Sequence, residues 1–521
     1  MSLPLGQALL RPAVSSDGRY IALITPTSAL QVIQVVDTLE VKVLFDGSPP
    51  KVAASFLSHL TVLKWSPLSS TADERSCPPW LLLSDGLRLL VFNTERLLEL
   101  AQDHGSSSPA YIAADYDFGE HSGKLSFADF LFDTKHVLVM FESSGIASIL
   151  STTRAQRDDI ANVKFTGQRG LTRSANHRTV SLLTRSKGQD QLLLLGLQEG
   201  EVRPQASFNL PTTDAQSAHF SPGLDPVLTV VDSPSYGVRV NFFSAMGHPL
   251  EALNMSGQFG TSSELDGVGV SQLRWARSMD NSILVVADGK KQILVREQNH
   301  QKLWVREIGI LQHPPTIDGS MSLVWQQTGD GEFVLQKAAF DAVQAAASTT
   351  DVILLETNCD QTFLASTVQD NPNTCWVWQP NHPDPHTIVT FTDHVKFLLW
   401  HPTEPNVLVV TTSSKDPMVY CWHTESRPPK RCAIPMTDTG SNKYEAKWVE
   451  PAVDGRHPFV MTSNKAIGYG LLRHENGQVI FDSLPDQTAV HLLDESDASA
   501  LATPSKPAKV KSQVTPNSEL W

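Results

Sequence analysis

Histidine and carboxylate side chains are abundant in this chain, but none of them occupies the spacing of a linear catalytic motif. The 521 residues include 17 His and 55 Asp or Glu. There is no Gly-x-x-x-x-Gly-Lys-Ser/Thr phosphate loop and no His-Glu-x-x-His zinc motif. Gly267-Val-Gly269 lacks the third glycine of a dinucleotide-binding loop. We therefore predict no catalytic, cofactor-binding or metal-ligating residues and no enzymatic activity. Residues that converge from several distant segments are the alternative.

The histidines and cysteines have simpler structural interpretations. We expect His59, His219 and His401 to pair with strand backbones or with Ser and Asp side chains in turns. No two cysteines have the two-residue spacing that metal and redox sites favour, so we expect reduced, packed side chains at all five positions. These are Cys77, Cys359, Cys375, Cys421 and Cys432.

The C-terminal stretch carries two threonines in a setting that proline-directed kinases read. Thr503-Pro504-Ser505-Lys506 has the Thr-Pro-x-Lys form of a cyclin-dependent kinase site, and Thr515-Pro516 is a second, weaker Thr-Pro site. Phosphate would add about −1.5 to −2 charges beside Lys506 and reverse the local basic character. Thr503 and Thr515 are therefore possible phosphosites.

The composition is that of a folded, acidic protein. Apolar residues make up 41% of the chain and charged residues 18%, which is enough to bury a large core and too little charge for a disordered polymer. A net charge of −14 argues against an extended face for nucleic acid. No basic leader precedes an apolar run at the start, and no run approaches the ~18 apolar residues of a membrane span. We expect a protein of the cytosol or nucleus, without membrane or nucleic-acid partners.

One stretch shows the repeating element most clearly. Phe363-Leu-Ala is a short apolar strand, Gln369 to Asn373 is a polar turn, and Cys375-Trp-Val-Trp378 is a strand of β-branched and aromatic residues. Val395-Lys-Phe-Leu-Leu-Trp400 then starts the pattern again. A period of about 40 residues with short strands and recurring aromatic residues is typical of the WD-repeat blade.

Nine blade-like units can be aligned along the chain. Their first strands end at Val14, Trp65, Phe132, Phe165, Phe220, Trp275, Thr357, Trp400 and Trp448. The third unit (Leu125 to Phe132) and the fourth (Val163-Lys-Phe165) have drifted and rest on strand pattern alone. We predict that the aromatic residues pack between blades, and exposed anchoring of a partner is the alternative for any one of them. The predicted blade aromatics are Trp65, Phe220, Trp275, Trp376, Trp378, Trp400, Trp422 and Trp448.

The predicted fold is an all-β, WD40-type β-propeller with four-stranded blades over residues 1–485. Either all nine units form one large ring, or one or two drifted units decorate its edge. An insertion is expected at about 305–350. Met321 to Trp325 and Phe333 to Leu335 can extend a blade edge there, and Ala338 to Ala347 favours a short helix. Residues 486–521 are expected to form a disordered tail.

Several of these motifs together resemble a known family. The set includes Phe363-Leu-Ala, Asp370-Asn-Pro-Asn373, Trp376-Val-Trp378 and the strand that ends at Trp400. It is similar to the WD repeat-containing protein eight family of centrosomal and spindle-pole proteins, also named for lying antisense to a tumour-suppressor gene, and to its fungal members. Further matching segments are Ser16-Asp-Gly-Arg-Tyr-Ile-Ala, Leu228-Thr-Val-Val-Asp-Ser, Asn299-His300 and His313-Pro314. The resemblance covers about residues 8 to 475.

Two departures from the family pattern are visible. Gln379 stands where family members often carry Asp, and the tail beyond Pro485 matches nothing in the family.

The resemblance implies a scaffold rather than an enzyme. Its members act in the cytoplasm and cytoskeleton, at microtubule-organising centres and spindle pole bodies. The implied partners are a coiled-coil microtubule-anchoring protein and a minus-end-directed kinesin-fourteen motor. Because a propeller alone does not choose a function, an adaptor for a ubiquitin ligase or an RNA-processing complex is the alternative.

Overall fold

The part of the chain that the structure describes lies between residues 12 and 483. The structure is a computed structural model. It describes residues 12–25, 27–37, 40–67, 78–102, 110–119, 123–142, 144–154, 156–175, 178–222, 226–250, 253–254, 269–277, 281–289, 292–299, 302–313, 322–329, 331–336, 351–424, 428–436, 444–449, 456–463, 466–475 and 478–483.

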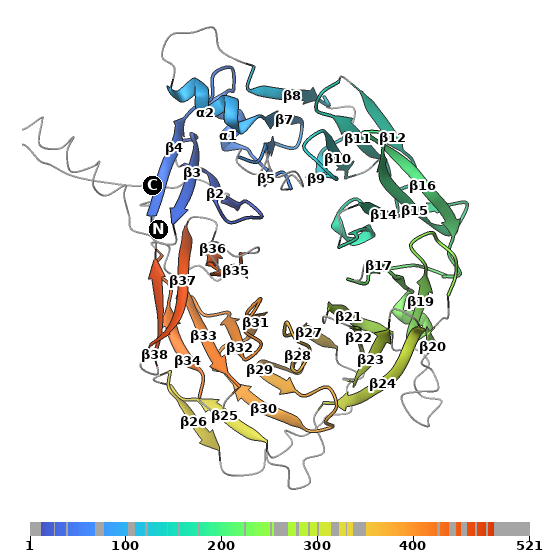
Figure 1. Ribbon diagram of the computed structural model, residues 1–521, viewed down its shortest axis with the longest axis vertical. Helices are drawn as coiled ribbons and strands as arrows, with labels where there is room; N and C mark the ends of the chain where they lie inside the picture. The colour runs from blue at the N-terminus through green and yellow to red at the C-terminus, as the bar shows by residue number, and fades with distance from the viewer. Residues whose placement is uncertain are drawn as a thin grey trace, which may run out of the picture.

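Nine sheets of described strands follow one another in chain order around a ring (Figure 1). In eight of them, four consecutive strands pair in sequence order, and neighbouring strands are antiparallel. The drifted third and fourth units are full members of the ring and do not decorate its edge. The predicted all-β propeller of four-stranded blades is therefore confirmed, with nine blades.

The first three blades span the described residues between 13 and 160. Blade 1 contains β1 (Ala13–Val14), β2 (Tyr20–Ile24), β3 (Leu30–Asp37) and β4 (Glu40–Gly47). Blade 2 contains β5 (Val62–Trp65), β6 (Leu81–Ser84), β7 (Arg88–Phe92) and β8 (Ile112–Asp117). Blade 3 contains β9 (Leu125–Phe130), β10 (His136–Phe141), β11 (Ala147–Ser151) and β12 (Arg157–Ile160).

Blades 4 to 6 form the next third of the ring. Blade 4 contains β13 (Leu171–Arg173), β14 (Thr179–Ser186), β15 (Gln189–Gln198) and β16 (Glu201–Asn209). Blade 5 contains β17 (Ser217–Phe220), β18 (Leu228–Val231), β19 (Arg239–Phe243) and β20 (Leu253–Asn254). Blade 6 contains β21 (Val270–Arg277), β22 (Asn281–Asp288), β23 (Gln292–Asn299) and β24 (Lys302–Gln312).

Blades 7 to 9 complete the ring. Blade 7 contains β25 (Leu323–Gln327), β26 (Phe333–Gln336), β27 (Val352–Thr357), β28 (Leu364–Val368), β29 (Asn371–Trp378) and β30 (Pro385–Thr390). Blade 8 contains β31 (Val395–Trp400), β32 (Val407–Thr412), β33 (Met418–His423) and β34 (Lys430–Ala433). Blade 9 contains β35 (Glu445–Trp448), β36 (Phe459–Thr462), β37 (Ile467–Glu475) and β38 (Gln478–Ser483).

The second strand of a blade is the most deeply buried. Every residue of β2, β10 and β32 is buried, whereas three of the four residues of β12, an outermost strand, are exposed. A strand with a blade packed on each face must be apolar on both faces, which explains continuous runs such as Val407-Leu-Val-Val. The blades therefore bury their centres against one another and leave their outer edges in water.

Side-chain packing between the first and last blades closes the ring. Among the described residues, nine apolar clusters form, one at each interface between neighbouring blades. The cluster between blades 9 and 1 brings Ile21 and Ile33 against Val460 and Tyr469. The Tyr469 hydroxyl also donates a hydrogen bond to the Gly18 carbonyl oxygen at 2.9 Å. No described strand is shared between these two blades, so packing and this bond join them.

The turn that receives the Tyr469 bond is built by its own sequence. Gly18 has a φ of 70°, a conformation that glycine adopts without a Cβ clash. The Ser15 hydroxyl bonds the Asp17 carboxylate at 2.5 Å and accepts the Tyr20 amide at 2.9 Å. A tight turn at Asp17-Gly18 therefore joins β1 and β2.

Blade 7 is wider than the others. β25 pairs in parallel with β30, and β26 pairs antiparallel with β25, which makes a six-stranded sheet. The segments expected to extend a blade edge, Met321 to Trp325 and Phe333 to Leu335, coincide with these two strands over their described residues. β24 is the outermost strand of blade 6, so it overlaps residues 305–312 of the expected insertion.

The first strand predicted for blade 4 is wrong. Val163 forms only an isolated bridge with Thr184, and the innermost strand is β13. The segment around Val163 instead runs beside β14, where the Lys164 amide donates to the Leu183 carbonyl at 3.0 Å. Phe165 therefore lies outside the strands, and Lys164 takes on a separate role described below.

Four short helices lie in the connections that the structure describes. α1 (Ala54–Ser58) and α2 (Thr94–Gln102) join the apolar cluster between blades 1 and 2 through Phe56, Leu57 and Leu97. η3 (Gln168–Gly170) leads into blade 4, and η4 (Pro234–Tyr236) follows β18. No helix within the described ranges is long and apolar enough to cross a membrane.

Some expectations fall outside the described residues. These are the helix at Ala338 to Ala347, the tail at 486–521 with Thr503 and Thr515, and Cys77.

Candidate functional site

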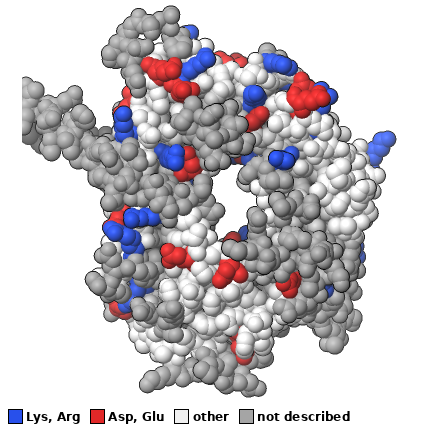
Figure 2. Space-filling model, in the orientation of Figure 1, with Lys and Arg blue, Asp and Glu red and all other residues white. Residues whose placement is uncertain are grey.

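A pocket of about 640 Å³ lies where the inner strands of blades 4, 5 and 6 meet. It borders the central opening of the ring, which is visible in Figure 2. Its wall is formed by η3 and the strands β13, β17 and β21, with the connection that leads into β17. The polar side chains used below are Arg169, Gln216, Ser217, His219, Gln272 and Arg274.

Two arginines from different blades supply the positive charge of the pocket. The Arg274 Nε lies 3.3 Å from the Glu356 Oε1 of blade 7, and its Nη1 donates to the Leu273 carbonyl at 3.1 Å. Arg169 is exposed, and its Nε donates to the Gln216 carbonyl at 3.3 Å. Its guanidinium also contacts the Gln216 side-chain oxygen and lies 4.8 Å from the Phe165 ring centre. Within the described residues, no carboxylate pairs with Arg169.

His219 lies between the two arginines on the middle blade and is neutral. Burial, and to a smaller extent the positive charge of Arg274, lower the pKa of His219 to about 4. The His219 Nε2 lies 3.0 Å from the Ser217 hydroxyl, which fits the expected pairing of this histidine with a Ser side chain. In the described part of the chain, its Nδ1 has no hydrogen-bond partner.

The pocket carboxylate, Asp232, already accepts hydrogen bonds from backbone amides. Asp232 is 1% exposed, and its Oδ1 accepts the amides of Asp214 at 2.9 Å and Ser233 at 2.8 Å. Its Oδ2 accepts the Thr213 amide at 3.2 Å. Asp232 therefore shapes the connection into blade 5 and offers little charge to a ligand.

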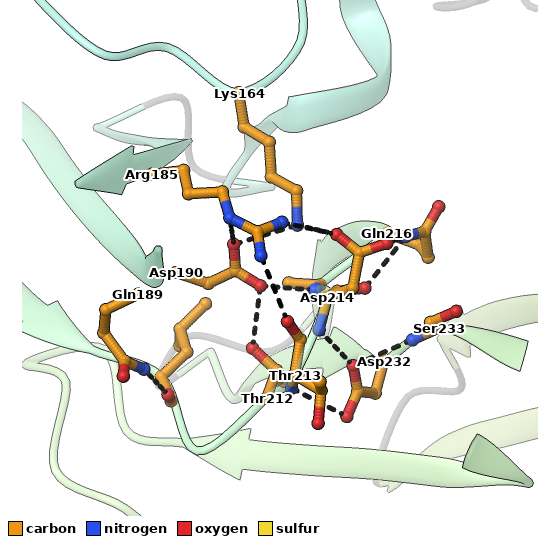
Figure 3. Close-up of polar contacts among 12 residues, drawn as sticks. Lys164, Arg185, Gln189, Asp190, Thr212, Thr213, Asp214, Gln216, Asp232 and Ser233 are labelled. Atoms are coloured by element: carbon orange, nitrogen blue, oxygen red, sulfur yellow. Dashed lines mark hydrogen bonds and ion pairs between the residues drawn. The ribbon is translucent and has the colours of Figure 1, made fainter. Parts of the chain in front are cut away.

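A partly buried ion cluster holds that same connection in place (Figure 3). The Lys164 Nζ lies 2.9 Å from Asp190 Oδ1 and 2.7 Å from Asp214 Oδ1. The Lys164 side chain is 7% exposed and that of Asp190 is fully buried. Arg185 Nη1 adds a contact of 2.9 Å to Asp214. We call these four residues, Lys164, Arg185, Asp190 and Asp214, the charged seam between blades 4 and 5.

Each member of the charged seam is placed by strand pairing or by backbone bonds. Arg185 and Asp190 face each other across the β14–β15 hairpin. The bridge at Val163 puts Lys164 beside β14. The second oxygen of Asp190 accepts the Ala215 amide at 2.6 Å, so both oxygens of this buried carboxylate are used. A buried carboxylate with two partners avoids most of the cost of leaving water.

The charged seam connects to the pocket through Gln216. The Gln216 side-chain amide donates to the carbonyl oxygen of Asp214 at 2.8 Å and to its carboxylate at 2.7 Å. Gln216 in turn accepts the hydrogen bonds of Arg169. The hydrogen bond from Lys164, followed by the charges of Lys164 and Arg185, lowers the pKa of Asp214 although partial burial opposes this. The ion cluster therefore positions the Arg169 guanidinium at the pocket.

The predicted blade aromatics lie at the interfaces between blades. Four of them stand in innermost strands, and their indole N–H groups reach the preceding blade: Trp65 to Ala13 O at 2.9 Å, Trp275 to Thr229 Oγ1 at 2.9 Å, Trp400 to Glu356 O at 3.3 Å and Trp448 to Leu399 O at 3.3 Å. Trp376, Trp378 and Trp422 are buried in the third strands of blades 7 and 8. Phe220 ends β17 and is 8% exposed.

The other two histidines named from the sequence also contact backbone or turn groups. The His59 Nδ1 lies 2.7 Å from the Ser55 carbonyl and 3.0 Å from the Ser58 hydroxyl. The His401 Nδ1 accepts the amides of Thr403 and Glu404 at 3.3 and 3.0 Å.

The described cysteines are free thiols. Cys375, Cys421 and Cys432 are buried, and Cys359 is half-buried. Burial raises the pKa of Cys375 to about 12 and that of Cys432 to about 11, so both are protonated at neutral pH. The described residues contain no group of three or more His, Cys, Asp or Glu side chains that could hold a metal ion.

The sequence patterns did not predict the pocket arginines or the charged seam. Lys164 and Asp190 are 26 positions apart, and Arg274 and Glu356 are 82 apart. No local period links such pairs. The one available signal is Asp190 itself, a charged residue two positions before the apolar run Leu192-Leu-Leu-Leu195 of a buried strand.

Comparisons with known proteins give a partial likeness. No family model matches the chain. An uncharacterized WD repeat-containing protein of Schizosaccharomyces pombe (strain 972) is 27% identical over 112 residues, which cover 20% of this chain. The chain spans 23% of the length of that relative. The chain is thus similar to a WD-repeat protein over one fifth of its length.

Solved structures with a similar course of the chain include a WD40 domain. The structure of Saccharomyces cerevisiae Sqt1 has a TM-score of 0.45 at 10% identity, over 76% of this chain and 93% of that chain. The C-terminal WD40 domain of Sif2 has a TM-score of 0.40 at 9% identity, over 83% of this chain and 100% of that chain. These likenesses concern the fold alone. The described strands of the chain form a nine-blade β-propeller.

Proposed function

We propose that this chain is a non-catalytic scaffold at the microtubule-organising centre or spindle pole body. It helps to anchor microtubule minus ends there and supports assembly of the mitotic spindle by binding other proteins. The observation that carries the scaffold role is the nine-blade ring, whose inner strands present a polar pocket beside the central opening. Binding sites of propellers lie on loops and on such inner edges, which a rigid ring holds in place.

The chemistry of the described residues supports binding rather than catalysis. The buried thiols are protonated, and the pocket carboxylate Asp232 accepts three backbone amides. The pocket side chains are donors and acceptors of hydrogen bonds. The Ser217 hydroxyl lies 3.0 Å from His219 Nε2, but no carboxylate among the described residues orients that imidazole through its Nδ1. A polar surface of this kind can fix the register of a bound segment.

The place of action rests on the sequence. The motifs of blades 7 and 8, from Phe363-Leu-Ala to Trp400, resemble the spindle-pole family. The proposed partners are a coiled-coil microtubule-anchoring protein and a minus-end-directed kinesin-fourteen motor. The proposed localisation is the cytoplasm and cytoskeleton, at the organising centre.

Affinity purification from dividing cells tests this function. A tagged full-length chain is expected to recover organising-centre components, identified by mass spectrometry, and to form foci at spindle poles by microscopy. Recovery of ubiquitin-ligase or RNA-processing subunits, without pole components, would assign the chain to an adaptor role instead. Turnover of generic ester, peptide or nucleotide substrates by the purified protein would contradict the scaffold role.

A further inference from the structure

We propose that the pocket of blades 4 to 6 binds an acidic peptide segment of a partner protein, with carboxylate side chains held between Arg169 and Arg274. This inference rests on the scaffold role proposed above and is independent of where the scaffold acts. It names the chemistry of the partner at a site that the blade repeats do not reveal.

The first support is an excess of accessible positive charge in an acidic protein. The chain has a net charge of −14. Arg169 has no carboxylate partner among the described residues, where it contacts the two oxygens of Gln216 and the ring of Phe165. An exposed guanidinium next to a pocket is an attachment point for a carboxylate, because its planar N–H groups match two oxygens.

The second support is that the oxygens of the carboxylate inside the pocket face donors of the protein itself. The two oxygens of Asp232 accept backbone amides, so its charge faces donors within the protein. Two further described carboxylates lie near the site. Asp214 is bonded to Lys164, Arg185 and the Gln216 amide. Glu356 lies 3.3 Å from Arg274. Burial raises the pKa of Glu356, which weakens its competition for the guanidinium. A ligand therefore meets Arg169, which has no carboxylate partner among the described residues, and Arg274, which shares its guanidinium with Glu356 and the Leu273 carbonyl.

The third support is the neutral group between the arginines. His219 is uncharged near neutral pH, and in the described structure its Nδ1 lacks a partner. A neutral imidazole can offer a hydrogen bond to a peptide carbonyl or carboxylate without adding charge. Ser217 and Gln272 add polar side chains on either side. This set of groups suits a peptide that is acidic at its ends and polar between them.

The geometry favours carboxylates over phosphate. Some N–H donors of the Arg169 guanidinium already bond Gln216, and those of Arg274 bond Glu356 and the Leu273 carbonyl. Each arginine therefore presents a few donors, enough for one carboxylate. A phosphate dianion would need more donors at one place and would lie close to Glu356.

The preference can be measured with purified full-length protein on a peptide array. The array carries short random peptides rich in Glu and Asp. Each acidic peptide is paired with a control of the same sequence in which Gln replaces Glu and Asn replaces Asp. The wild-type chain should bind the acidic members and lose them at high salt, because partly exposed ion pairs are screened. Arg169→Gln and Arg274→Gln should each weaken binding about tenfold, the loss of one charge-assisted hydrogen-bond pair.

Matched variants separate the pocket from general charge. Arg96→Gln removes a positive charge from the exposed surface of α2 in blade 2, and binding should be unchanged. Arg169→Lys keeps the charge and should retain more binding than Arg169→Gln. Unchanged circular dichroism and thermal midpoint would show that each variant is folded.

The outcomes distinguish this inference from the proposed function. Equal binding of acidic and amide peptides, or a preference that survives both arginine changes, would overturn the pocket assignment even if pole proteins still co-purify. Binding only to phosphoserine versions of the peptides, or full displacement by inorganic phosphate, would overturn the carboxylate preference. Conversely, a confirmed acidic preference with no pole components recovered would leave the pocket intact and remove the spindle role.

Discussion

Neighbouring blades are joined by two different chemistries in different parts of the ring. At the interfaces of blades 7 with 8 and 8 with 9, which we call the tryptophan seams, Trp400 and Trp448 insert at the end of an inner strand and bond the preceding blade through the indole N–H. Between blades 4 and 5, the charged seam of Lys164, Arg185, Asp190 and Asp214 connects the blades next to the apolar cluster.

The difference follows the drift of the repeat. Blades 8 and 9 keep the aromatic residue at the end of the first strand, and each can use it to reach its neighbour. In blade 4, Phe165 lies outside the strands, and blade 5 has Phe220, which has no N–H to donate. Charged side chains connect this part of the ring instead, and Arg173 Nη2 bonds the Phe130 carbonyl of blade 3 at 2.5 Å. The repeat tryptophan is therefore lost on the blade 4 and blade 5 side of the pocket, whereas blade 6 keeps Trp275, which bonds Thr229 Oγ1 at 2.9 Å.

The largest expected effect concerns a tryptophan seam. Trp400 is 8% exposed, and Trp400→Ala should lower the free energy of unfolding by ~3–5 kcal/mol because it opens a cavity between blades 7 and 8. Chemical denaturation followed by tryptophan fluorescence and circular dichroism measures this. A thermal midpoint equal to that of the wild type would show that the side chain is not part of the core.

Breaking the charged seam should lower the free energy of unfolding nearly as much as Trp400→Ala does. Lys164→Met leaves the buried Asp190 carboxylate with Arg185 at 3.8 Å as its nearest cation among the described residues, and we expect a loss of about 3 kcal/mol. The double variant Lys164→Met, Asp190→Leu should recover part of that loss, since the unpaired charge is gone. Equal stability of the single variant and the wild type would mean that the ion cluster adds nothing to the seam.

Acid should weaken blade 5 more than the tryptophan seams, where burial also lowers the pKa of His401 beside Trp448. The folded-state pKa of His219 is lowered from 6.5 to about 4, so the unfolded chain binds the proton first as the pH falls through this window. The free energy of unfolding therefore falls between about pH 6.5 and pH 4, by on the order of 3 kcal/mol in total. At still lower pH, protonation of the Asp214 carboxylate, whose pKa is lowered in the folded state, reduces the free energy of unfolding further.

Hydrogen exchange of the separate blades, followed by mass spectrometry, measures this acid effect. Peptides from β17 should lose protection between about pH 6.5 and pH 4. His219→Gln should flatten that dependence while the peptides of β31 and β35 stay unchanged. Parallel loss in all blades would contradict a local effect.

The smallest expected effect isolates a single hydrogen bond. Trp448→Phe keeps most of the ring volume but removes the donor to the Leu399 carbonyl, so the loss should be about 1 kcal/mol. Comparison of Trp448→Phe with Trp448→Ala in the same denaturation assay separates the bond from the packing. If the phenylalanine variant is as unstable as the alanine variant, the whole effect belongs to the bond.

The repeating parts of the fold could be predicted because their signals are local. Trp400 and Trp448 close short apolar strands that recur about every 40 residues, so nine blades and their order follow from spacing. Blade 4 could not be placed correctly, because Val163 and Phe165 mimic a strand end. Only the pairing with β14 reveals that β13 is the inner strand.

The candidate site depends on contacts across blades, which no short motif encodes. His219 was expected to bond a neighbouring Ser, and it does, but its place between Arg169 and Arg274 requires the ring. Gln216 transmits the position of Asp214 to Arg169 through side-chain hydrogen bonds. Hydrogen bonds of this kind between separate segments follow no sequence period, so they appear only in the folded structure.

The central claim is that this propeller recruits partners through the pocket of blades 4 to 6. The most direct measurement is quantitative mass spectrometry of proteins that co-purify from mitotic cells with the tagged wild-type chain and with the Arg169→Gln, Arg274→Gln double variant. We predict that the wild type recovers organising-centre proteins, and that the double variant, with Arg96→Gln as the matched control, loses those that carry acidic segments. Identical sets of partners for the wild type and the double variant would contradict the claim.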